Sequence, residues 1–297
     1  MLRDSPQGES LTKQKGRYKT MKIHILGSGG GEGIPSLFCH CANCDYARKH
    51  GGKNIRTLCQ TLINDDLLLD FSYDTPRHFE NGICVSDIEN ILITHSDEDH
   101  FFPYLFSLRG AWGAYNMKKE TVHVHGNATV TEMLETAKKG FYPDVANGII
   151  THCVNSRTEI IVGKYTVFTL HAKHSPKQEA LNFVISDGEK AVLYMVDSGY
   201  PDLKYFDRLI EIGLKLDCVI MDCASGNIEP AQYPYHSTAG NNAQFKKVLE
   251  EMGLVNENCK FIATHFTHSC APSQEEMERL LSPYGIIAAY DGMTIEI

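Results

Sequence analysis

The chain has 297 residues and a formal net charge of −9, because 37 Asp and Glu residues outnumber 28 Lys and Arg residues. At 42% hydrophobic and 22% charged, its composition is that of an ordinary globular protein, which excludes wholesale disorder, collagen and coiled coil. No apolar run reaches the roughly 18 residues needed to span a bilayer. The acidic balance argues against a nucleic-acid partner, because neutralising phosphates needs a basic surface.

The first 20 residues carry several Lys and Arg but lack the apolar core of a secretory signal. We therefore expect a flexible extension over residues 1–20 and a single domain over residues 21–297. Without a signal, the ten Cys residues are expected to be reduced, which predicts a cytoplasmic protein in which clustered Cys bind metal.

Alternating apolar residues and turn residues predict strands that are interleaved with helices. Strands are expected at 22–26, 60–64, 67–70, 90–94, 122–125, 160–162, 165–170, 181–185, 191–196, 218–221, 260–263, 286–289 and 294–297. Helices are expected at 100–115, 129–139, 202–213, 241–252 and 277–281. This order predicts an α/β fold in which two mixed sheets pack face to face with helices outside.

A cluster of metal-binding residue types follows the predicted buried strand 90–94. Within six residues the chain offers His95, Asp97, Asp99 and His100. Further candidates follow other predicted strands: His174, Asp197 and His265. A mononuclear site would need only four of these groups, whereas a two-metal site, with ions about 3.5–4 Å apart, would use all of them.

This pattern resembles the metallo-β-lactamase superfamily, whose signature is His-x-His-x-Asp-His followed by a later His, an Asp and a final His. The resemblance implies an αββα sandwich with the active site at one rim between the sheets. It also implies that His95 and His174 bind metal 1, that Asp99, His100 and His265 bind metal 2, and that Asp197 bridges the two metals. Position 97 holds Asp where the signature has its second His. We expect Asp97 to be a metal ligand that favours Mn or Fe over Zn.

A second cluster has the spacing Cys-x-Cys-x-x-Cys at Cys39, Cys41 and Cys44. A redox pair would not need Cys39, and a closed tetrahedral zinc site needs a fourth ligand, for which His268 is the candidate. The cluster resembles that of the phosphodiesterases related to the cyclic-phosphate hydrolase of phosphonate degradation, in which three Cys and the His of a Thr-His-x-x-His segment bind a structural zinc. The Gly-rich loop 27–33 also matches that branch.

The same resemblance implies roles for two more residues. Asp70 stands where the superfamily has a strand-end Asp that orients a ligand His. His236 matches a His that reaches the substrate in the phosphodiesterase branch, so Asp99 and His236 are the predicted catalytic residues.

The predicted function is hydrolysis of a small, perhaps cyclic, phosphodiester by a dinuclear centre of Mn, Zn or Fe, with one structural Zn elsewhere. The expected partner is a small phosphorylated substrate, with no membrane and no nucleic acid, and a homodimer is left open. Three alternatives from the same superfamily stay open: a di-iron redox protein, a tRNA-processing nuclease and a quinone-cofactor biosynthesis protein.

Overall fold

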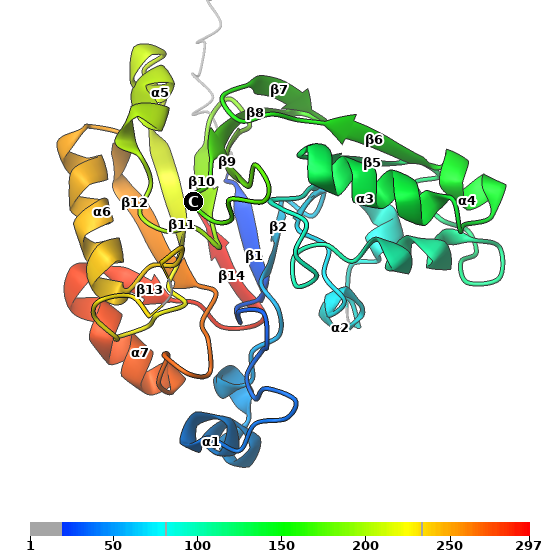
Figure 1. Cartoon of the computed structure of the whole chain (residues 1–297). Helices are drawn as coiled ribbons and strands as arrows, with labels where there is room; N and C mark the ends of the chain where they lie inside the picture. The colour runs from blue at the N-terminus through cyan, green and yellow to red at the C-terminus, as the bar shows by residue number, and fades with distance from the viewer. Residues whose placement is uncertain (1–19, 81, 233) are drawn as a thin grey trace, which may run out of the picture.

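The computed structural model describes residues 20–80, 82–232 and 234–297. The predicted extension 1–20 lies, but for its last residue, outside the described part of the chain. Two seven-stranded mixed sheets form the centre of the molecule (Figure 1). Within the described residues, no helix is long and apolar enough to cross a membrane.

The first sheet has the strand order β14-β1-β2-β3-β4-β5-β6. Its strands are β1 (Lys22–Gly27), β2 (Gln60–Ile63), β3 (Leu67–Leu69), β4 (Asn90–Leu92), β5 (Val122–Gly126), β6 (Ile149–Cys153) and β14 (Met293–Glu296). Strands β3 to β6 run parallel, while β14, β1, β2 and β3 pair antiparallel.

The second sheet has the order β13-β12-β11-β10-β9-β8-β7. Its strands are β7 (Glu159–Val162), β8 (Tyr165–His171), β9 (Leu181–Ser186), β10 (Ala191–Met195), β11 (Leu216–Asp222), β12 (Val255–Thr264) and β13 (Ile286–Ala288). Strands β10 to β13 run parallel and β7 to β10 antiparallel, so each sheet is half parallel and half antiparallel.

Helices cover the outer face of each sheet (Figure 1). The α-helices are α1 (Ala42–His50), α2 (Thr75–His78), α3 (Ala128–Lys138), α4 (Pro143–Asn147), α5 (Asp207–Glu211), α6 (Ala239–Glu251) and α7 (Gln274–Leu281). The 3-10 helices are η1 (Gly52–Asn54), η2 (Val85–Asp87), η3 (Pro103–Arg109), η4 (Leu203–Phe206) and η5 (Ser282–Tyr284). Helix α3 contacts β5 and β6, α6 contacts β12, and α7 contacts β13.

Three buried apolar clusters correspond to these layers. The central cluster joins the inner faces of both sheets, for example Ile25 of β1 and Ile220 of β11. An outer cluster packs Leu134 of α3 on the first sheet, and another packs Phe245 of α6 on the second. Burial on both faces explains why the parallel strands read as continuous apolar runs rather than alternating ones. The predicted αββα architecture is confirmed.

The helix predicted over 100–115 is wrong. The structure has only η3 there, followed by turns that contain Gly110 and Gly113. Pro103 removes one backbone donor. Gly113 packs so closely on the chain that a Cβ would lie 2.6 Å from the carbonyl oxygen of Leu108. The apolar residues of this segment pack under the first sheet without helical periodicity. Helices α1, α2 and α4 and strand β6 were not predicted.

Candidate metal centre

Nine carboxylate and imidazole side chains meet at one edge of the two sheets, where six strands end, all of them but β8 in a parallel pair. Asp70 follows β3, segment 95–100 follows β4, and His174 follows β8. In the second sheet Asp197 follows β10, Asp222 ends β11 and His265 follows β12. The carboxyl ends of parallel strands share one edge of a sheet, which is why residues far apart in the sequence converge here. Asp70, Asp197 and His265 have positive φ values of 66°, 50° and 61°, which turn the chain sharply at this edge.

The segment after β4 is a tight turn that presents two imidazoles. The carbonyl oxygen of Asp97 accepts hydrogen bonds from the backbone N–H groups of His100 (2.9 Å) and Phe101 (2.7 Å). The turn places the rings of His95 and His100 with their centroids 4.3 Å apart. Both side chains are buried, so the turn directs them into the protein rather than toward solvent.

Asp70 orients both of these rings. One oxygen of its carboxylate accepts a hydrogen bond from Nδ1 of His100 (2.9 Å). The other accepts from the hydroxyl of Thr94 (2.9 Å), whose oxygen in turn lies 2.9 Å from Nδ1 of His95. With Nδ1 engaged in each ring, Nε2 is the nitrogen that faces the centre. This geometry is the one that the predicted orienting role of Asp70 requires.

Asp197 lies between two groups of candidate ligands. Its Oδ2 is 3.1 Å from Nε2 of His95 and 3.3 Å from Nε2 of His100. Its Oδ1 is 3.3 Å from Nδ1 of His174. Two such groups, each with all ligand atoms within 4.8 Å of one another, are His95, His174 and Asp197, and Asp99, His100, Asp197 and His265. A third, which overlaps the second, is Asp197, Asp222, His236 and His265. They share Asp197, as a bridging carboxylate would.

These residues fit divalent metal ions. Two ligands 2.0–2.1 Å from a tetrahedral metal lie about 3.4 Å apart, close to the separations from Asp197. Several buried polar atoms here also lack a hydrogen-bond partner among the described residues: Nε2 of His95, Nδ1 of His174, Oδ1 of Asp197 and Nδ1 of His265. Buried polar atoms without partners are costly, and a cation would satisfy the first three.

Charge at the centre is complementary to cations. Burial by itself would disfavour charge on these groups, but their neighbours outweigh it. Asp99 raises the pKa of His100, and Asp197 raises that of His265, in each case well above the usual value. Conversely, His265 and His100 hold the pKa of the Asp197 carboxyl well below its usual range. The carboxylates of the centre therefore stay ionised, and a metal ion would replace the protons that they hold on the imidazoles.

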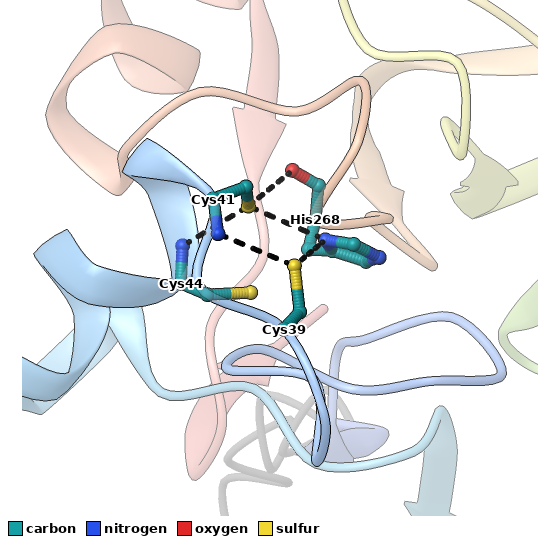
Figure 2. A group of neighbouring side chains, drawn as sticks. All are labelled: Cys39, Cys41, Cys44 and His268. Atoms are coloured by element: carbon teal, nitrogen blue, oxygen red, sulfur yellow. Dashed lines mark hydrogen bonds between the residues drawn. The ribbon is translucent and has the colours of Figure 1, made fainter.

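The Cys cluster is a further group of candidate ligands, which shares no residue with those at the metal centre. Figure 2 shows its side chains. Nδ1 of His268 lies 3.4 Å from Sγ of Cys39 and 3.4 Å from Sγ of Cys41. Around a tetrahedral zinc, with bonds of about 2.3 Å to sulfur and 2.0–2.1 Å to nitrogen, this separation would be about 3.6 Å. Cys44 completes the group, in which all ligand atoms lie within 4.8 Å of one another.

Cys41 is the N-cap residue of α1. Its Sγ accepts a hydrogen bond from the backbone N–H of Cys44 at the start of the helix. Burial raises the pKa of the Cys41 thiol, but the hydrogen bonds with His268 and Cys44 outweigh burial and lower it to about 6. A thiolate is the form that binds metal, so this position is prepared for an ion.

Comparison with known proteins identifies the family. A model of the beta-lactamase superfamily domain matches residues 66–266. The chain belongs to this family. The metallo-β-lactamase fold occurs mostly in metal-dependent hydrolases, and it implies divalent metal binding.

Coenzyme PQQ synthesis protein B of Methylobacterium radiotolerans is 33% identical to the chain over 94 residues, which cover 27% of this chain and 31% of that relative. The match thus spans less than a third of the relative's length.

Solved structures share the fold of this beta-lactamase superfamily domain. A diphosphatase from the PhnP family superposes with a TM-score of 0.70 at 20% identity, over 94% of this chain and 98% of that one. YhfI from Bacillus subtilis gives a TM-score of 0.69 at 16% identity, over 94% and 100% of the two chains. Zinc-bound PqqB from Methylobacterium extorquens gives a TM-score of 0.64 at 14% identity, over 93% of this chain and 100% of that one. At these identities the likeness shows the fold alone.

Asp97 lies beside the metal-ligand groups of this superfamily domain rather than within them. Its Oδ2 is 3.2 Å from Nε2 of His174, whereas the other ring nitrogen of His174, Nδ1, faces Asp197. The same oxygen is 3.6 Å from Nε2 of His95, and Gln178 donates a hydrogen bond to Oδ1 (3.0 Å). The predicted ligand role of Asp97 stays a prediction.

Sequence reasoning missed Asp222. This buried carboxylate lies 2.9 Å from Nδ1 of His236 and 3.3 Å from Nδ1 of His265. It therefore brings the predicted catalytic His236 to the edge of the centre, where Nδ1 of His236 is also 3.2 Å from Oδ1 of Asp197. Asp222 follows the predicted strand 218–221, just as Asp70 follows the apolar run 67–69. That pattern was the available signal.

Proposed function

We propose that this chain is a metal-dependent phosphodiesterase that hydrolyses a small phosphodiester. The observation that supports it most is the position of Asp197, within 3.3 Å of nitrogen atoms from both ligand groups and of His236. When bound, a pair of divalent cations would polarise a phosphoryl oxygen and lower the pKa of a water between them. Among its structural neighbours, one is a diphosphatase.

The chain's own residues supply positioning and proton transfer. Asp99 is largely buried, with Oδ2 3.3 Å from Nε2 of His100, where it can accept a hydrogen bond from the attacking water. Burial disfavours charge on His236, but Asp222 and Asp197 outweigh it and raise its pKa. A charged His236 can stabilise negative charge on the phosphoryl group and donate a proton to the leaving oxygen.

We propose further that the cluster of Cys39, Cys41, Cys44 and His268 holds a structural zinc. Three thiols and one imidazole are a closed tetrahedral set, which leaves no position for a substrate. The cluster ties α1 to the segment that follows β12, because His268 lies three residues beyond His265. Its role in this proposal is to fix that segment.

The test is turnover by purified protein loaded with Mn²⁺, Zn²⁺ or Fe²⁺. Bis(4-nitrophenyl) phosphate and the cyclic phosphates of ribose and nucleosides serve as substrates. We expect metal-dependent hydrolysis that Asp197→Asn lowers by about 100-fold or more, because one carboxylate serves both groups. Asp187→Asn, in the turn between β9 and β10, is the matched control. Hydrolysis of none of these substrates with any metal would contradict the proposal, and oxygen consumption by the iron form would point instead to redox chemistry.

A further inference from the structure

A pocket of about 260 Å³ lies on the outer side of the first sheet and shares no residue with the metal-ligand groups. The buried part of its wall includes Ile91 of β4, Val122 of β5 and Phe106 of η3, which belong to the outer cluster that packs against α3. Its rim includes Leu108, which is 44% exposed, and the exposed Cys84. This volume is at the small end of ligand sites, which measure about 300–1,000 Å³. An apolar pocket with an exposed rim can take up a short apolar chain.

One cationic side chain stands in this apolar wall, the half-buried Arg109 at the end of η3. Its Nη2 donates hydrogen bonds to the carbonyl oxygens of Lys119 (3.0 Å) and Glu120 (2.8 Å), which fix the side chain. Nη1 and Nε carry the other three of its five N–H groups and have no hydrogen-bond partner among the described residues. Burial lowers the pKa of Arg109, but a guanidinium stays charged at neutral pH. Arg109 is therefore a fixed charge with three donors that a ligand can use.

No carboxylate of the described residues neutralises the charge of Arg109. None of them lines the pocket, and none forms an ion pair with the guanidinium. Two carboxylates close by in the chain, Asp87 and Glu89, pair with lysine side chains instead, at 2.6 and 2.9 Å. The side chain of Glu120, whose carbonyl oxygen binds Arg109, is exposed to solvent. An anionic group that reaches Arg109 therefore meets no opposing charge in the wall of the pocket.

We propose that this pocket binds a fatty acid of medium length, with the alkyl chain in the apolar part and the carboxylate on Arg109. The planar guanidinium matches the two oxygens of a carboxylate, and a charged hydrogen bond is stronger where water is partly excluded. The apolar wall supplies affinity for the chain, because each CH₂ group that leaves water contributes to binding. The site is independent of the proposed hydrolysis, so its test does not depend on turnover.

The first test is isothermal titration calorimetry of the metal-loaded protein with butanoate, hexanoate, octanoate and 1-octanol. We expect each added CH₂ group to tighten binding about fourfold, as burial of a CH₂ group does. The alcohol has the chain of octanoate without its charge and should bind about tenfold or more weakly, because it lacks the charged hydrogen bond. In Arg109→Gln, octanoate should lose this advantage, while 1-octanol should bind as before and thereby show that the pocket is intact.

Arg77→Gln is the matched control, because Arg77 is an exposed residue of α2 that follows the pocket residue Pro76 but does not line the pocket itself. It removes the same charge and should leave all affinities unchanged. Ala114→Phe places a ring in the pocket and should abolish binding of both octanoate and 1-octanol. Affinity that does not increase with chain length would overturn the proposal. So would equal binding of octanoate by the wild type and Arg109→Gln, or full binding by Ala114→Phe.

The second test locates the ligand through Cys84, an exposed thiol that lines the pocket. Cys153, at the end of β6, is exposed but does not line the pocket, and it serves as the control within the same molecule. Mass spectrometry of peptides measures how fast iodoacetamide alkylates each thiol. At an octanoate concentration ten times its Kd we expect alkylation of Cys84 to slow about tenfold and that of Cys153 to stay unchanged. An unchanged rate at Cys84 would overturn the proposal, because octanoate would then bind elsewhere, for example at the active-site metals.

Discussion

His100 and His265 face each other across the metal centre with their Nε2 atoms 3.2 Å apart. Nδ1 of His100 donates to Asp70, and Nδ1 of His265 lies 3.3 Å from Asp222. Each ring is thus oriented from behind by a buried carboxylate at the end of a strand. Two imidazole lone pairs that converge in this way repel each other unless a proton or a metal ion lies between them.

Asp70→Asn should weaken metal binding about 10- to 100-fold, as is usual when a carboxylate behind a ligand His is lost. The variant should also unfold about 1–3 kcal/mol more easily, because the backbone N–H of Thr94 (2.8 Å) and the hydroxyl of Tyr194 (3.2 Å) bond to the same carboxylate. Competition with a chelator measures the affinity, and Asp87→Asn in η2 is the control. Reduced stability with unchanged metal affinity would show that Asp70 only supports the fold.

Asp97→His should shift the metal preference from Mn²⁺ or Fe²⁺ toward Zn²⁺, because an imidazole would replace a carboxylate near His95. The measurement is metal content after dialysis against equal concentrations of the three ions. An unchanged preference would contradict the ligand role. It would leave Asp97 as the residue that holds Nε2 of His174, where its oxygen already lies 3.2 Å away.

Cys41→Ser should remove about one zinc per chain and lower the melting temperature, since a closed structural site contributes directly to folding. The active-site metals should be retained at first, because all their predicted ligands except His265, which shares the segment after β12 with His268, come from other strand ends. Zinc content and thermal unfolding are the measurements, with the exposed Cys153→Ser as control. A variant with full zinc content would show that the cluster is not the structural site.

The lowered pKa of His78 predicts that the protein loses stability in acid. Burial lowers its pKa to about 4, and its ring bonds to the hydroxyl of Thr57 and to Oε1 of Gln60, both at 2.6 Å. Because the pKa in the folded chain lies below the ordinary 6.5, folding favours the neutral ring. Its contribution to the free energy of unfolding is complete above pH 6.5 and is lost as the pH falls toward 4. The pKa difference corresponds to a loss of about 3 kcal/mol.

Denaturant unfolding of the metal-loaded protein at pH 7, 5.5 and 4 measures this effect. His78→Gln should show a smaller decrease in the free energy of unfolding over this range than the wild-type protein. The exposed His40→Gln is the control and should follow the wild type. If His78→Gln and the wild type lose stability equally, the pKa of His78 is not lowered in the folded chain.

Much of the fold could be predicted because apolar periodicity is a local property of the chain. The hairpins at β2–β3 and β9–β10 follow from apolar runs on either side of turn residues, and the capping box of Ser273 and Glu276 marks the start of α7. The helix prediction for 100–115 was wrong because the apolar residues of this segment pack around Pro103 and two glycines without helical periodicity.

The sequence by itself determined which residue types stand at the ends of the buried strands: imidazoles and carboxylates where apolar runs stop, and three closely spaced thiols. Only the tertiary structure decided which atom of each side chain faces which neighbour. It turned Nε2 of His174 toward Asp97 and Nδ1 toward Asp197, and placed Asp222 behind His265. The physical reason is that strand order and the turns after each strand set these directions, and both depend on contacts between residues far apart in the chain.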